Sequence, residues 1–525
     1  MVHPVLINGV WVASKGTKTF QAVNPATEQP IPGDFPVSPW AELDAAIAAA
    51  SEATRETRGW PGSRFADFLE CYAAEIEKIA EQLVETAHLE TALPKSPRLK
   101  DAELPRTINQ LRQAATAARS DSWRDPIIDR AAGIRSMLGP IGPVIVFGPN
   151  NFPFAFNGVS GGDFAAAIAA GNPVIAKGHA CHPETTRLFA EAALISIRET
   201  GMPRALVQLV YRTSHEDGFR LVSDHRIGAI GYTGARHTGL KLKAAADACG
   251  KPIYLELSSI NPVFVLQGAI VEKGDALAND FTTSCLMGTG QFCTNPGIVV
   301  IPKSPEGDTF LNSVADRFKA ANVGTMLGQS VRDSFAAGIG VLTGAGAEVV
   351  TGGKPGGGKG FCFQNTLLKI SAESFVKQPE TFQTEAFGNG SLFIVADSPE
   401  QMVAVAEALE GNLTGCIYSD STGKDDSAYD IIAPALRCRV GRLLNDKMPT
   451  GVAVSAAMNH GGPFPATGHP GFTAVGIPTS IRRFAMLQSF DNVRAHRLPS
   501  ILQDKNPNGQ VWRRIDGEWT KADVS

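Results

Sequence analysis

The sequence predicts an α/β protein built from a doubly wound, mostly parallel sheet and a second α/β domain. After Arg135, short β-branched runs alternate with alanine-rich segments at roughly 25-residue spacing, which is typical of parallel strands joined by crossover helices. These runs are VIVF (144–147), VIAK (174–177), LVQLV (206–210), IGAIGY (227–232) and IYLEL (253–257). The pattern restarts beyond Asn261, and 525 residues are too many for one compact core.

The first 120 residues predict a hairpin and three helices. Asn8-Gly9 lies between two apolar runs in VLINGVWVA (5–13), and this dipeptide favours a tight hairpin because both turn positions tolerate positive φ. Apolar residues then recur at helical spacing over 40–58 and 64–89, and a third helix is expected near 97–118.

The second α/β domain is expected to begin with PVFVLQGA. A helix near 272–287, a glycine-rich loop and the strands IVVIP (298–302) and SLFIVA (391–396) follow. From Ile477 onward the tail carries RRFAMLQSF, VRAHRLPSIL and a polar Asn-Pro-Asn-Gly turn.

Composition excludes several classes of protein. With 48 Lys plus Arg against 52 Asp plus Glu, the net charge is -4, so there is no basic excess for nucleic acid. The most apolar stretch, 164–176, is too short to cross a bilayer, and the N-terminus lacks the pattern of a secretory signal. Eight dispersed cysteines favour reduced thiols in a cytoplasmic protein without a membrane partner.

Three separated segments carry candidate catalytic groups. Cys293 lies in TGQFCTNPG between a helical pattern and a strand, where glycines let backbone approach a ligand. Glu256 ends an apolar strand in YLELSSINP, where a carboxyl group is suited to proton transfer. Asn151 follows a buried strand in FGPNNFPFAF and offers an amide donor for an oxyanion.

In this order, FGPNNFP, VIAKGH, GYTGARHTG, LELSSINP, GQFCTNPG and TEAFG resemble the signature blocks of the NAD(P)-dependent aldehyde dehydrogenase superfamily. The resemblance covers nearly the whole chain. The block KGHACHPET and the run NNFPFAF are similar to the branch that contains α-ketoglutaric semialdehyde (2,5-dioxovalerate) dehydrogenases and an NADP-dependent fatty aldehyde dehydrogenase.

The resemblance implies a role for each catalytic residue. Cys293 is the nucleophile that forms a thiohemiacetal and then a thioester. Glu256 activates the water that releases the carboxylate, and it precedes Cys293 by about the family's spacing. The side chain of Asn151 and the backbone N–H of Cys293 hold the oxyanion.

The resemblance also implies a set of cofactor-binding residues. Lys177 holds the adenosine ribose, Glu385 the nicotinamide ribose, and Phe387 packs at the nicotinamide end. The segment Gly231–Gly239 places a helix N-terminus beside the pyrophosphate, and from it we single out four residues: Gly231, Thr233, Gly234 and Gly239.

The sequence departs from the NAD-preferring members of the superfamily three residues after Lys177. Those members often carry an acidic residue there, whereas this chain has Ala180, so no carboxylate repels a 2'-phosphate. Arg212 follows the strand LVQLV and is a candidate phosphate partner, or else an ordinary surface arginine. We therefore expect NADP as the preferred cofactor, with NAD also possible.

The resemblance implies the domain organisation. Residues 1–122 and 142–262 are expected to form the dinucleotide-binding domain, and residues 263–476 the catalytic domain. Residues 123–141 and 477–525 are expected to form an oligomerisation arm and C-terminal tail, which implies a homodimer or homotetramer.

Three other motifs have simpler explanations. GVSGG (158–162) nominates Ser160 as a hydrolase nucleophile but lacks a preceding strand. GKPGGGKG (353–360) has Gly360 where a phosphate-binding loop needs Ser or Thr. His179, Cys181 and His182 lack a second ligand pair, so we expect no metal.

The sequence leaves the aldehyde open. The branch favours oxidation of α-ketoglutaric semialdehyde to 2-oxoglutarate, and the alternative is an NADP-dependent long-chain or broad-specificity dehydrogenase. Other readings are a serine hydrolase using Ser160, a CoA-acylating enzyme or a nucleotide-binding protein without chemistry. A substrate carboxylate needs an Arg or Lys in the entrance, and we expect the entrance near Phe156 and Phe464.

Overall fold

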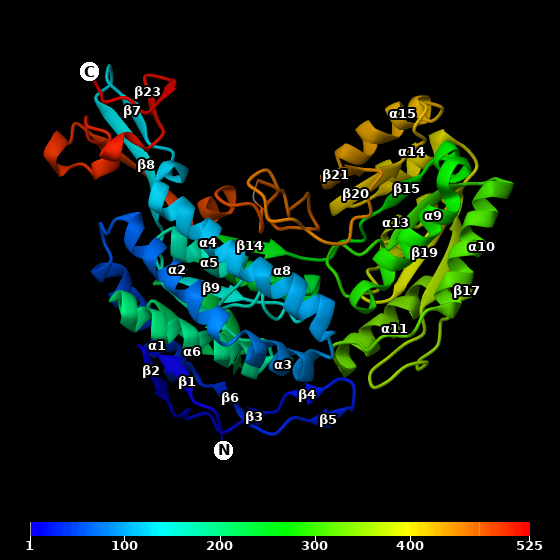
Figure 1. The fold of residues 1–525 in the computed structure, drawn as a ribbon, viewed down its shortest axis with the longest axis horizontal. Coiled ribbons are helices and arrows are strands. Elements are labelled where there is room, and N and C mark those ends of the chain that lie inside the picture. Colours follow the sequence, from blue (N-terminus) through cyan, green and yellow to red (C-terminus); the bar gives the residue numbers. More distant parts are fainter. Residues whose placement is uncertain (1, 472) are drawn as a thin grey trace.

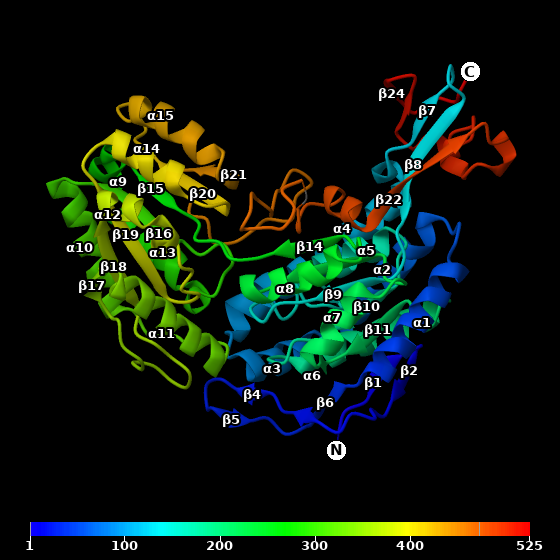
Figure 2. The same cartoon turned by 180° about the vertical axis from the view of Figure 1, so that it is seen from behind.

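The structure, a computed structural model, describes residues 2–471 and 473–525. It contains two large sheets flanked by helices, with a smaller sheet projecting away from the first of them (Figures 1 and 2). The predicted α/β class with a second α/β part and a β arm is confirmed.

The first sheet has seven strands in the order β14-β13-β9-β10-β11-β1-β2. The strands from β14 to β11 are parallel, as predicted from their β-branched runs. The hairpin is also confirmed, with Asn8 and Gly9 at φ 49° and 70°, and it extends this sheet in antiparallel fashion. The bounds are β1 (Val5–Ile7), β2 (Val10–Val12), β9 (Val144–Phe147), β10 (Val174–Lys177), β11 (Val207–Val210), β13 (Ala229–Thr233) and β14 (Ile253–Glu256).

Helices cover both faces of this sheet: α2 packs on α4 and α6, and α7 packs on α8. Their bounds are α1 (Trp40–Glu56), α2 (Gly62–Lys78), α3 (Ala80–Thr91), α4 (Leu104–Ser120), α5 (Gly162–Ala169), α6 (Pro183–Thr200), α7 (His215–Ser223) and α8 (Arg236–Asp247). Short strands outside the sheet are β3 (Thr19–Phe20), β4 (Val23–Asn24), β5 (Gln29–Pro30), β6 (Phe35–Ser38) and β12 (Arg212–Thr213).

Two of the predicted helices differ in the structure. The expected helix over 64–89 is divided at Ile79, whose non-helical φ of -108° lets α3 turn and pack on α6. The helix expected near 97–118 is a π-helical segment, η1 (Lys95–Glu103), followed by α4.

The strand order creates a crevice beside β9. The chain runs from β9 to β10 and β11 on one side, then returns to β13 and β14 on the other. The loops after β9 and β13 therefore diverge at the carboxyl edge of the sheet, which is where ligands bind in open α/β sheets.

The second sheet has seven strands in the order β17-β18-β19-β16-β15-β20-β21, and only the β17–β18 pair is antiparallel among the described ladders. Both faces are apolar: Phe264 points into one buried cluster while its neighbours Val263 and Val265 point into another. The strands are β15 (Val263–Val265), β16 (Ile298–Pro302), β17 (Glu348–Thr351), β18 (Thr366–Ser371), β19 (Gly390–Ala396), β20 (Asn412–Tyr418) and β21 (Val440–Asn445).

The helices of this part are α9 (Gln267–Leu286), α10 (Pro305–Ala320), α11 (Gln329–Gly344), α12 (Ala372–Lys377), α13 (Pro379–Phe382), α14 (Pro399–Ala408) and α15 (Asp426–Arg437). Helix α9 begins five residues before the expected start at 272 because a kink at Lys273 joins two helical pieces.

The arm is a five-stranded sheet in the order β22-β8-β7-β23-β24. It joins residues of the first third of the chain, β7 (Ile127–Asp129) and β8 (Ile134–Pro140), to three strands from the end. Those strands are β22 (Ala485–Asp491), β23 (Arg513–Ile515) and β24 (Glu518–Thr520). The domain boundaries stay a prediction.

Residues 446–478 connect the second sheet to η4 (Thr479–Phe484) and, over the positions that the structure describes, contain no named helix or strand. The orange trace in Figure 1 crosses between the two sheets. It binds the edge of β14, since the N–H of Leu257 donates to the carbonyl of Ala466 (2.8 Å) and that of Gly468 to Leu255 (3.0 Å).

Candidate active site

A cavity of about 650 Å³ lies where the two large sheets face one another. The first sheet contributes the residues that follow β9, β13 and β14, and the second part contributes Cys293, one end of α11, Glu385 and Phe387. Cys293, Glu256 and Asn151 all line this cavity, so the structure brings together the three groups that the sequence nominated.

A strained turn and two side-chain hydrogen bonds position Cys293. The turn before it has three successive residues at positive φ, Gly288 to Gly290, and the middle one is a threonine. The Asn261 side chain then donates to the carbonyls of Cys293 (2.8 Å) and Asn295 (2.9 Å). The cysteine loop is therefore held by backbone atoms, which leaves the thiol free for chemistry.

The thiol contacts a histidine that also contacts Glu256. Sγ of Cys293 lies 3.5 Å from Nε2 of His460, and this nitrogen lies 2.8 Å from Oε1 of Glu256. Both His460 and Glu256 are buried. The second carboxylate oxygen, Oε2, has no hydrogen-bond partner among the described residues, so it is available to a water molecule.

The sequence analysis did not identify His460. It lies in the irregular segment 446–478, where no periodicity marks the direction of a side chain. Its backbone N–H donates to Oγ1 of Thr473 at 2.6 Å, and its ring packs against Phe156 with 5.9 Å between centroids. The available signal was the adjacent Gly461-Gly462-Pro463, which marks a loop, and loops often carry functional residues.

The environment of Cys293 keeps the thiol protonated at neutral pH. Burial raises the pKa of Cys293 well above its ordinary value, and the nearby carboxylate of Glu256 raises it further. The Arg106 guanidinium opposes this effect and lowers the pKa of Cys293. The thiol therefore needs a base when it reacts, and His460 and Glu256 are both within reach.

Asn151 has a free N–H group on the cavity side. Nδ2 of Asn151 donates to the carbonyl of Gln291 at 3.0 Å, and a primary amide has two N–H groups. The backbone N–H of Cys293 has no acceptor among the described residues. Two donors are therefore available beside the sulfur for a developing oxyanion.

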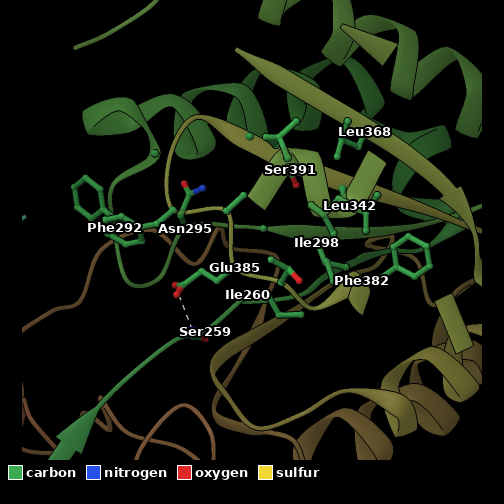
Figure 3. Close-up of a pocket in the computed structure, with 18 residues that line it drawn as sticks. Ser259, Ile260, Phe292, Asn295, Ile298, Leu342, Leu368, Phe382, Glu385 and Ser391 are labelled. Carbon is green, nitrogen blue, oxygen red and sulfur yellow. Dashed lines mark hydrogen bonds between the residues drawn. The ribbon is translucent and has the colours of Figure 1, made fainter. Parts of the chain in front are cut away.

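Four of the predicted cofactor-binding residues line the cavity: Thr233, Gly234, Glu385 and Phe387. Thr233 and Gly234 lead into α8, whose first N–H groups have no helical acceptors and favour an anion. Glu385 accepts a hydrogen bond from the N–H of Ser259 at 3.3 Å (Figure 3), and burial raises its pKa to about 7.

Gly231 and Gly239 do not line the cavity. A Cβ atom at Gly231 would lie 2.5 Å from Oδ2 of Asp163, and one at Gly239 would lie 2.5 Å from Cδ2 of Leu257. Close packing against neighbouring side chains explains both glycines, so the structure gives them no direct contact with this cavity.

Lys177 and Arg212 lie near one another beyond the cavity. Lys177 ends β10, and its ammonium group has no hydrogen bond or ion pair among the described residues. Burial lowers the pKa of Lys177 to about 8, and the Arg212 charge lowers it further. The pair forms a positive region next to Ala180, where the two cations lack a carboxylate partner.

These features fit a dinucleotide. The free helix N-terminus accommodates a pyrophosphate, the unpaired cations accommodate adenosine-side phosphate, and Glu385 and Phe387 line the same cavity as Cys293. The residues present therefore match the chemistry of NAD or NADP.

The three discounted motifs have structural explanations. Ser160 is fully buried and its Oγ donates to the carbonyl of Phe154 at 2.8 Å, so it does not serve a hydrolase. The loop 353–360 leads into a strand rather than a helix. In the third motif, Nε2 of His182 lies 2.9 Å from the carbonyl of Pro149.

Ligand atoms of Glu256, Cys293 and His460 lie within 4.8 Å of one another, a spacing that a metal ion tolerates. A metal ion bound there would coordinate Sγ of Cys293. The expectation that the enzyme uses no metal stays a prediction.

An apolar cluster includes Phe292, the residue directly before Cys293. Phe152 packs edge-on against Phe156 and Phe292, each with 5.3 Å between centroids. The segment that carries Phe152 and Phe156 is irregular, because residues 152–161 form turns and the next helix, α5, begins at Gly162. Phe464 lies apart from this cluster, exposed and 5.4 Å from the Arg236 guanidinium.

Comparisons with known proteins agree with this geometry. The sequence profile of the aldehyde dehydrogenase family matches residues 11–456. The chain belongs to the aldehyde dehydrogenase family. It is 37% identical to alpha-ketoglutaric semialdehyde dehydrogenase 2 of Azospirillum brasilense, over 96% of this chain and 97% of that protein. It is 33% identical to alpha-ketoglutaric semialdehyde dehydrogenase of Acinetobacter baylyi, over 98% of each chain.

Solved structures share the fold of this aldehyde dehydrogenase. PnpE from Pseudomonas sp. WBC-3 matches with a TM-score of 0.80 and 23% identity, over 93% of this chain and 97% of that one. Betaine aldehyde dehydrogenase of Staphylococcus aureus, as its G234S mutant, matches with a TM-score of 0.81 and 19% identity, over 94% and 96%.

The protein is therefore an NAD(P)-dependent aldehyde dehydrogenase that acts on small aldehydes. Among the described residues, the helices are all too short or too polar to span a membrane.

Proposed function

We propose that this aldehyde dehydrogenase oxidises α-ketoglutaric semialdehyde to 2-oxoglutarate with NADP as its preferred cofactor. The observation that carries the catalytic part is the contact series from Cys293 through His460 to Glu256 at the cavity wall. The substrate rests on the two relatives of this name, which are 33–37% identical over nearly the full length.

Cys293 acts as the nucleophile. Its thiol loses a proton to the adjacent His460, and the thiolate adds to the aldehyde carbon to form a thiohemiacetal. The free N–H of Asn151 and the backbone N–H of Cys293 donate to the oxygen as it gains negative charge.

The second half of the reaction needs a hydride acceptor and a water molecule. NAD(P), when bound, accepts the hydride of the aldehyde carbon. Glu256 then takes a proton from water through Oε2, the oxygen without a partner, and the hydroxide releases the carboxylate from the Cys293 thioester.

A substrate panel tests this proposal. Purified protein is mixed with α-ketoglutaric semialdehyde, glutaric semialdehyde, hexanal or decanal, each with NAD or NADP, and absorbance at 340 nm is followed. We expect the highest kcat/KM for α-ketoglutaric semialdehyde. The highest value for decanal would support the long-chain alternative, which the apolar cluster at Phe152 and Phe156 favours.

Arg212 provides a test of the cofactor preference. We expect Arg212→Gln to raise the KM for NADP by about tenfold, because one charge-assisted hydrogen bond to phosphate is lost, while the KM for NAD stays within twofold. The exposed Arg198 on α6 serves as a charge-matched control through Arg198→Gln. An equal change for both cofactors contradicts the assignment.

The arm supports association of subunits. Its edge strand β22 exposes Met486 and Leu487, which are 46% and 66% exposed in the single chain. Apolar side chains on an unpaired strand edge favour pairing with another chain. We therefore retain a homodimer or homotetramer as part of the proposal, together with a cytoplasmic location.

A further inference from the structure

Arg106 is a half-buried cation whose Nε and Nη2 atoms have no hydrogen-bonding partner. It lies in the first turn of α4, and its Nε and Nη2 atoms are both inaccessible and without a hydrogen-bond acceptor among the described residues. Over the residues that the structure describes, Arg106 forms no ion pair. Burying a guanidinium in this way is costly unless an anion completes the site.

The surroundings of Arg106 are aromatic. Its guanidinium carbon lies 5.6 Å from the ring centroid of Phe152 and 5.2 Å from that of Phe156. Phe156 in turn packs against His460, which contacts Cys293. A short series of contacts therefore joins the unpaired cation to the reacting sulfur.

Neighbouring charges are already engaged. Glu103 accepts hydrogen bonds from Arg98 and from the N–H groups of Phe154 and Ala155. Arg98 also donates to the carbonyl of Asn151 at 3.1 Å. Arg442 donates to the carbonyls of Pro449 and Gly451, each at 3.3 Å. Of these three arginines, Arg106 alone lacks an acceptor.

We propose that Arg106 binds the distal carboxylate of the substrate, so that the aldehyde carbon at the other end of the chain lies against Cys293. This inference rests on the proposed function and adds to it the residue that selects anionic aldehydes. A planar guanidinium offers paired N–H donors that match a carboxylate, and the phenylalanine rings exclude the water that would compete.

The position of Arg106 explains why it also affects Cys293. Its charge lowers the pKa of Cys293, while burial lowers the pKa of Arg106 itself and the negative charges of Glu103, Cys293 and Glu256 oppose that effect. A role that consists only of stabilising the thiolate is therefore the competing explanation. The two explanations differ in their dependence on substrate charge.

The test uses two aldehydes that differ in charge and by one methyl group, glutaric semialdehyde and its methyl ester. We expect the wild-type protein to prefer the acid. In Arg106→Met, kcat/KM for the acid should fall by about 10- to 100-fold, mainly through KM, because one charge-assisted interaction is lost. The ester should change by less than about threefold. Arg106→Lys keeps the charge without the paired donors, so its kcat/KM for the acid should lie between the values of the wild type and of Arg106→Met.

A second measurement does not depend on turnover. Glutarate should protect Cys293 from alkylation by iodoacetamide in the wild-type protein but not in Arg106→Met. The matched control is Arg112→Met on the same helix, because Arg112 is exposed and pairs with Glu77 at 2.9 Å. Thermal midpoints within a few degrees of the wild type show that the variants are folded.

Each possible result supports or overturns the proposed role of Arg106. Equal losses on acid and ester show that Arg106 acts only on the thiolate and overturn the inference, and so does a wild-type protein without preference for the acid. In both cases the dehydrogenase activity itself stands. A wild-type protein that oxidises neither these two aldehydes nor α-ketoglutaric semialdehyde overturns the proposed function and the inference together.

Discussion

Replacing Cys293 by alanine should reduce aldehyde oxidation by a factor on the order of 10⁴ or more, because no other group at the cavity wall forms the covalent intermediate. Binding of NADP should persist with a dissociation constant within about threefold of the wild type, since loss of one side-chain Sγ removes no other group that lines the cavity. Turnover is followed at 340 nm and binding by NADPH fluorescence.

Cys438→Ala is the matched control for this change. Cys438 is exposed and free, so its loss should leave both turnover and binding unchanged. Retained turnover in Cys293→Ala would reject the assignment of the nucleophile.

Replacing Glu256 by glutamine should change two rates in opposite directions. Glu256 raises the pKa of Cys293, so removing its charge lowers that pKa and increases the thiolate fraction at pH 7. Alkylation of Cys293 by iodoacetamide at pH 7 should therefore become faster, by about tenfold for a shift of one pKa unit. Steady-state turnover should fall by about 10²- to 10⁴-fold, because no base activates the water.

The pH profile of alkylation shows directly whether Glu256 raises or lowers the pKa of Cys293. In the wild-type protein the rate should rise with pH through the neutral range and level off above the raised pKa of the thiol. In Glu256→Gln the whole profile should move to lower pH. Glu348→Gln, at an exposed carboxylate paired with Lys369, should leave the profile in place. Slower alkylation in Glu256→Gln would instead show that this carboxylate deprotonates Cys293.

Sequence reasoning identified the groups that follow regular elements. Glu256 is the last residue of β14, and Asn151 lies in the loop after β9. Parallel strands bring their carboxyl ends to one edge of the sheet, so the convergence of these two residues was predictable. Cys293 was recognisable from its glycine-rich context. The parallel core was predictable because its short β-branched runs differ from the helical segments between them.

Other parts of the site depend on contacts between distant segments. His460 reaches Cys293 from an irregular segment that is held by the edge of β14, and no local pattern encodes that pairing. Arg106 lies on an amphipathic helix that carries several arginines, and only the structure shows that its partners are rings of the loop after β9. Gly231 and Gly239 differ from these cases. The motif that contains them predicted contact with a ligand, whereas close packing against neighbouring side chains explains both glycines.

The composition of the arm sheet bears on how the protein is made. Strand β8 pairs along its whole length with β22, and β7 pairs with β23, so strands from the first third of the chain need partners from its end. During translation, β7 and β8 emerge from the ribosome long before those partners are synthesised. β7 and β8 pair with each other, so the nascent chain must keep only the two open edges of this hairpin apart from its neighbours on the polysome, and the arm closes after nearly all of the polypeptide has been synthesised.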